Sequence, residues 1–130
     1  MQLNLSAKEL RLLLDLVYIG NWVLNSTRGS DRFWEYDQVQ SRVFSCCPHL
    51  AVDLGGLTVP SQEYVEGGIH EAISYYEDNI FYEILAEELS RRDMDYPEID
   101  EDNYPEIARR MQDYMQEFEL SGVDHLKLEE

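Results

Sequence analysis

Few side chains in the sequence have the types and the spacing that catalysis needs. Cys47 and His49 stand two residues apart, and a cysteine beside a histidine is a pair used in nucleophilic catalysis. No motif surrounds this pair, and the other cysteine, Cys46, is its direct neighbour, which disulfide geometry disfavours as a partner. We interpret both cysteines as reduced thiols near a helix end and assign no catalytic residue. The sequence therefore favours a protein that is not an enzyme.

The spacing of the candidate metal-binding and phosphate-binding residues also does not match any known motif. Glu66 precedes His70 by four residues, but two glycines stand between them. The acidic segment Asp93–Asp102 is rich in the oxygen ligands that calcium takes. A calcium loop of the EF-hand type that began there would need glycine and an acid where the sequence has Glu98 and Tyr104. No glycine-rich phosphate motif occurs, so we assign no metal and no cofactor.

The charge balance is the strongest signal in the composition. The 130 residues carry 27 Asp and Glu against 10 Lys and Arg, a net charge of −17. Such a surface repels phosphates, which argues against direct binding to nucleic acid. Residues 1–60 hold six acids and five bases, so nearly all of the excess negative charge follows residue 60. This acidic half is either a solvated surface or a landing surface for a basic partner.

Two aromatic residues and four acids are the candidate partner-binding residues. Tyr18 and Trp22 stand four apart on the polar strip of the first expected helix, where they either cap the edge of the core or anchor a partner. The acids lie in the connector before the last helix: Asp93, Asp95, Asp100 and Asp102. Together these residues predict a protein partner, either a basic one or a second copy of the chain.

The hydrophobic pattern predicts one mainly α domain over residues 1–130, a compact bundle of about four helices. A Gly-Gly pair between two short apolar arms predicts a small hairpin within residues 51–60. The alternating ends, residues 2–5 and 125–128, are expected to pair as a short ribbon. The helices are expected near residues 6–25, 31–47, 69–92 and 105–121.

The first and third helices have the most distinctive faces. The first opens with a capping box, Ser6 and Glu9, and is apolar on most of its circumference, which predicts a central position. Asn21 lies on that apolar side and needs hydrogen-bond partners if it is buried. The third helix is expected to contact neighbours on two sides, because Phe81, Leu85 and Leu89 lie nearly opposite its main apolar stripe. That main stripe is Ile69, Ile73, Tyr76, Ile80 and Ile84.

Three segments carry a resemblance to other proteins: Gly20–Ser26, Phe81–Asp93 and Gly122–Leu126. In these segments the chain resembles a group of small acidic bacterial proteins of uncharacterised function. The resemblance implies a helical cytoplasmic protein and supplies no activity and no catalytic residues.

We therefore expect a non-enzymatic interaction or regulatory protein that binds a protein partner. Two alternatives stay open: a mimic of nucleic acid that occupies a DNA-binding protein, and a small enzyme or ligand binder with an unrecognised pocket. The apolar stretch Leu12–Leu24 is interrupted by polar residues and is shorter than the roughly 20 residues of a membrane span. Since the first residues lack the features of a secretory signal, we expect a cytoplasmic location and no membrane partner.

Overall fold

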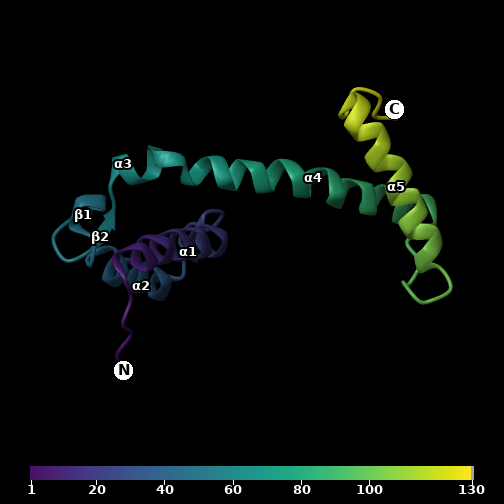
Figure 1. The fold of residues 1–130 in the computed structure, drawn as a ribbon. Coiled ribbons are helices and arrows are strands. Elements are labelled where there is room, and N and C mark those ends of the chain that lie inside the picture. Colours follow the sequence, from purple (N-terminus) through teal and green to yellow (C-terminus); the bar gives the residue numbers. More distant parts are fainter. Residues whose placement is uncertain (130) are drawn as a thin grey trace. The chain divides into compact units, whose positions relative to one another are not determined.

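The computed structural model describes residues 1–129, and the chain forms two compact units, Met1–Ile73 (unit 1) and Ser74–Glu130 (unit 2). The predicted mainly helical fold with a short hairpin is confirmed (Figure 1). Whether the two units unfold together as one domain stays a prediction. The longer helices are α1 (Ala7–Asn25), α2 (Trp34–Phe44), α4 (His70–Asp93) and α5 (Tyr104–Ser121).

The start of α1 forms as its sequence predicts. The Ser6 hydroxyl accepts a hydrogen bond of 3.1 Å from the backbone N–H of Glu9. The Glu9 carboxylate accepts one of 3.0 Å from the backbone N–H of Ser6. These reciprocal bonds satisfy two of the N–H groups that a helix start leaves without partners.

The start of α2 lies three residues after its predicted position. Asn25, at the end of α1, clamps the incoming chain: its amide oxygen accepts from the backbone N–H of Phe33 at 2.8 Å, and its amide nitrogen donates to the Phe33 carbonyl at 3.1 Å. Phe33 is thereby held in an extended conformation, so the helix begins only at Trp34. Sequence patterns alone do not reveal such a bond between a side chain and a distant backbone.

A hairpin and a wide turn connect α2 to α4. Strands β1 (Ala51–Asp53) and β2 (Thr58–Pro60) pair antiparallel, and the predicted glycine pair supplies the turn with φ values of +76° and +111°. A short 3-10 turn, η1 (Pro48–Leu50), precedes β1. After β2, the single turn α3 (Gln62–Tyr64) leads into the wide turn η2 (Val65–Ile69), where Gly68 adopts φ +114° and redirects the chain into α4.

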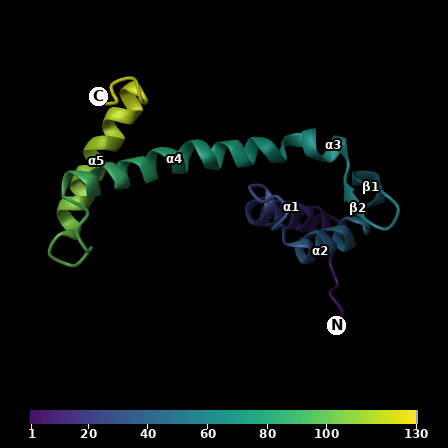
Figure 2. The same cartoon turned by 180° about the vertical axis from the view of Figure 1, so that it is seen from behind.

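The core of unit 1 is small. It consists of Leu14, Phe44, Cys47 and Tyr64, and the rings of Phe44 and Tyr64 meet edge to face at 5.0 Å. Helices α1 and α2 lie side by side in both views (Figures 1 and 2). The expectation that α1 is central is wrong in part for unit 1: α1 contacts α2, Tyr64 of α3 and His70 of α4, but these contacts do not cover its whole apolar surface. Three of its apolar residues are exposed: Leu12, Leu16 and Val23.

Unit 2 is built from the larger part of α4 and from α5. Its buried side chains include Ala86, Ser90, Ile107 and Phe118, and the ring of Tyr82 lies 5.4 Å from that of Phe118. The fully buried positions of α4 in this unit are thus small residues, Ala86 and Ser90, rather than large apolar ones. The predicted stripe of α4 is therefore partly wrong: Ile73 is buried, but Tyr76 and Ile84 are more than half exposed.

The predicted pairing of the chain ends is wrong. Residues 2–5 and 125–128 contain no strand, and β1 and β2 form the one sheet found in residues 1–129. Four-residue ribbons have few ladder bonds and are marginal without support from a core. None of the helices in the described residues has the length and apolar character needed to cross a membrane.

Candidate functional site

Tyr18 and Trp22 lie together in unit 1, as their spacing on α1 predicts. Their rings are 6.3 Å apart and nearly parallel. His70, the first residue of α4, joins them: a hydrogen bond of 2.6 Å links the Tyr18 hydroxyl to the His70 Nε2 atom, and the His70 ring meets Trp22 edge to face at 4.8 Å. Burial raises the pKa of the Tyr18 hydroxyl, which keeps it protonated at neutral pH. The aromatic pair is thus a fixed wall rather than two mobile side chains.

A charged network lies beside this wall, between α1 and α2. Arg32 donates two hydrogen bonds to the carboxylate of Asp37, at 2.6 and 2.7 Å. Asn21 donates a third to Asp37 at 3.0 Å, and its own amide oxygen accepts from Asn25 at 2.7 Å. Asn21 is buried with partners, so the requirement stated from its position on α1 is met.

Hydrogen bonding fixes the charge state of this network. The two bonds from Arg32, followed by the bond from Asn21, hold the pKa of Asp37 below its usual value despite burial. The same bonds to Asp37 raise the pKa of the Arg32 guanidinium. The pair is therefore ionised at neutral pH and its charges balance each other.

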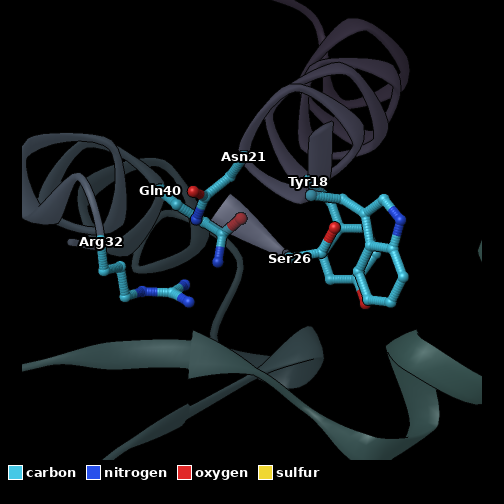
Figure 3. Close-up of a pocket in the computed structure, with 6 residues that line it drawn as sticks. Tyr18, Asn21, Ser26, Arg32 and Gln40 are labelled. Carbon is cyan, nitrogen blue, oxygen red and sulfur yellow. The ribbon is translucent and has the colours of Figure 1, made fainter. Parts of the chain in front are cut away.

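A pocket of about 260 Å³ opens between the network and the aromatic wall (Figure 3). Tyr18 and Ser26 lie on one side, and Asn21, Arg32 and Gln40 lie on the other (Figure 3). Trp22, which packs against Tyr18, also lines the pocket. The side-chain carbonyl oxygen of Gln40 is buried and accepts no hydrogen bond from any residue between 1 and 129. An acceptor in this state is costly unless something donates to it.

The four acids of the predicted partner site lie in unit 2 and have different roles. Asp93 pairs with Arg92 at 2.8 Å and accepts a hydrogen bond from the Tyr114 hydroxyl, and the Tyr114 bond is the first cause of its lowered pKa. Asp100 folds the connector: one of its carboxylate oxygens accepts from the backbone N–H groups of Asp102 and Asn103, both at 2.9 Å.

The carboxylates of the other two acids, Asp95 and Asp102, form no hydrogen bond or ion pair with another described residue. Asp95 is exposed and adopts a left-handed backbone conformation with φ +62°. Asp102 is exposed, and its backbone N–H rather than its carboxylate takes part in the turn. All four acids are exposed, and Asp95 and Asp102 differ from the other two in that their carboxylates bond to no other described residue.

The other sequence candidates have structural surroundings. The Cys47 sulfur lies 3.8 Å from both ring nitrogens of His49, and Cys47 is part of the core of unit 1. His70 contacts the aromatic wall instead of Glu66. Within residues 1–129, no three His, Cys, Asp or Glu side chains gather closely enough to hold a metal ion.

Sequence analysis missed Arg32, Asp37, Gln40 and His70 as site residues. One signal was present, because Asn21 on an apolar face demands a polar partner on a neighbouring helix. Asp37 and Gln40 stand three apart on α2 and so share a face. Nothing in the sequence indicates that this face of α2 meets Asn21. No protein-family model, no curated protein and no solved structure matches the chain.

Proposed function

We propose that the protein is a non-enzymatic interaction protein that recruits a basic protein partner through the acidic surface of unit 2. The observation that carries the proposal is uncompensated charge. Residues 74–130 hold 18 Asp and Glu against five Lys and Arg. Long-range attraction from such a surface accelerates the encounter with a positively charged partner.

Ion pairs inside unit 2 already engage its arginines. Arg109 pairs with Glu106 at 2.7 Å and with Asp113 at 3.2 Å, and Arg110 pairs with Glu106 at 2.9 Å. Arg91 and Arg92 pair with acids of their own helix end. Most carboxylates of the unit therefore have no arginine partner among the described residues, and their charge is available to an incoming cation.

The connector between α4 and α5 supports the proposal by presenting charge on a defined backbone. Asn103 donates to the Glu98 carbonyl at 2.7 Å and accepts from the backbone N–H of Asp100 at 2.9 Å. These bonds fold the loop while Glu101 and Asp102 stay exposed. A surface ordered before binding loses less conformational entropy on binding. A second copy of the chain carries the same negative charge and would be repelled from this surface.

Affinity capture with a charge variant tests the proposal. In the variant Glu98→Gln/Glu101→Gln/Asp102→Asn, three surface charges are removed while the carboxylate of Asp100 that folds the loop remains. We expect the wild type to retain a basic protein from a native cell extract at low salt. The variant, and the wild type at high salt, should lose it. The control is Glu35→Gln/Gln38→Glu in unit 1, which leaves the net charge unchanged. Capture that is the same for the variant and at high salt would contradict the proposal.

A further inference from the structure

The pocket beside Tyr18 and Trp22 is a separate feature that the acidic surface of unit 2 does not use. All of its lining residues come from unit 1, between Tyr18 and Gln40. Its volume of about 260 Å³ is just below the range of about 300–1,000 Å³ typical of small-molecule sites, so it fits a molecule of one or two rings at most.

The charged residues at the pocket, Arg32 and Asp37, do not favour a charged ligand. Asp37 receives three hydrogen bonds from Arg32 and Asn21, which occupy its carboxylate. Arg32 donates from its Nε and from one terminal nitrogen to the same carboxylate. Because this pair is neutral as a unit, a charged ligand would gain little at it that water does not already offer.

Gln40 is the pocket residue with a buried side-chain atom that lacks a hydrogen-bond partner among residues 1–129. Its buried side-chain oxygen lacks a donor, and the amide nitrogen on the same group is itself a donor. A primary carboxamide thus offers an acceptor beside a donor. The complementary edge on a ligand is an N–H donor beside a carbonyl acceptor, the edge of an amide or a lactam. In the view of Figure 3 the Gln40 side chain lies between those of Arg32 and Tyr18.

The opposite wall sets the shape of the ligand. Trp22 keeps 37% of its surface exposed although its ring is held by Tyr18 and His70. An indole fixed in place with an open part is suited to stack against a flat ring, and aromatic contacts add about 0.5–1.5 kcal/mol beyond the area that they bury. The hydroxyl of Ser26 stands on the same side and can both donate and accept.

We infer that this pocket binds a small, uncharged, planar aromatic molecule that carries an amide-type edge, with its ring against Trp22 and its edge paired to the Gln40 carboxamide. The inference is independent of the proposed protein partner, because the two features lie in different units and use different residues.

Benzamide is the probe that tests it, since it is a flat ring with a primary amide. Titration of the full chain, followed by nuclear magnetic resonance, should give saturable shifts at the Trp22 indole N–H. N,N-dimethylbenzamide keeps the ring and the carbonyl but lacks the N–H donors, so it should bind roughly tenfold more weakly. This comparison needs no mutation. Benzoate, which replaces the amide by an anion, should also bind more weakly.

A matched pair of variants locates the contact. Gln40→Leu keeps the size of the side chain and removes the amide, and it should weaken benzamide by roughly tenfold. Gln38→Leu changes an exposed residue of the same helix and should leave binding unchanged. The inference is overturned if benzamide causes no saturable shift up to its solubility limit, if the dimethyl compound or benzoate binds as tightly as benzamide, or if Gln40→Leu binds like the wild type.

Discussion

The substitution Asp37→Ala is the sharpest test of how unit 1 is held together. Asp37 is 9% exposed and is the common acceptor of Arg32 and Asn21, which come from the loop and from α1. Removing one member of a buried ion pair typically costs about 3–5 kcal/mol. The Arg32 side chain is 33% exposed, so water recovers part of that cost. Asn21 is 7% exposed, and an orphaned buried donor costs about 1–3 kcal/mol.

The orphaned Asn21 donor is part of the cost of breaking the pair rather than an addition to it, and water at Arg32 lowers that cost. We therefore expect Asp37→Ala to lose about 2–4 kcal/mol in the free energy of unfolding. Urea denaturation followed by tryptophan fluorescence is the appropriate assay, because both tryptophans, Trp22 and Trp34, lie in unit 1. The control Glu35→Ala removes an exposed acid from the same helix turn and should cost far less. If the two variants lose the same stability, the network does not stabilise unit 1 and the reasoning fails.

Three further results follow from the same structure. The stability difference between wild type and Asp37→Ala should be at its full size above pH 3.8, the ordinary pKa of an Asp carboxyl, and should shrink as the pH falls below it. The reason is that the pKa of Asp37 is lowered in the folded state, so protonation at acidic pH removes the stability that the ionised carboxylate contributes; a difference that grows on acidification would contradict this. Gly68→Ala should destabilise by about 1–3 kcal/mol since Gly68 has φ +114°, whereas Gly20→Ala in α1 should stabilise by about 0.5–1 kcal/mol, both read from thermal melts. Leu14→Ala should cost about 2–5 kcal/mol in urea denaturation and Leu16→Ala about 0.5 kcal/mol, because Leu14 is fully buried and Leu16 is 71% exposed; equal losses would show that the core is wrongly placed.

Local sequence signals were sufficient to predict the positions of most helices and of the hairpin. The capping box at Ser6, the glycine pair of the hairpin and Pro105 at the start of α5 each act within a few residues, and each appears where the sequence places it. The start of α2 differs because the clamp by Asn25 joins residues eight apart.

Burial was harder to predict than helix position. A helix that is apolar nearly all round predicts burial on every side, yet the contacts of α1 with α2, Tyr64 and His70 leave Leu16 exposed. In α4, two small residues, Ala86 and Ser90, are fully buried. Hydrophobicity alone favours Ile84, which is exposed instead.

In the candidate sites too, features set by residues close in the sequence could be predicted, and features set by tertiary contacts could not. Tyr18 and Trp22 are neighbours on one helix, so their spacing was enough to bring them together. Gln40 and His70 lie at least 18 residues from Tyr18 and Trp22 in the sequence and come near them only through tertiary folding, which no periodic pattern encodes. The uncompensated charge of unit 2 was visible in the composition. The difference between the carboxylate of Asp100, which folds the connector, and that of Asp102, which does not, needed the hydrogen bonds.

The most direct test of the acidic interaction surface is the salt dependence of binding to the basic protein that affinity capture identifies. The association constant of the full chain for that partner should fall steeply as salt rises. The variant Glu98→Gln/Glu101→Gln/Asp102→Asn should bind more weakly at low salt and show a shallower slope. Binding that does not change with salt, with equal affinity for wild type and variant, would contradict the account.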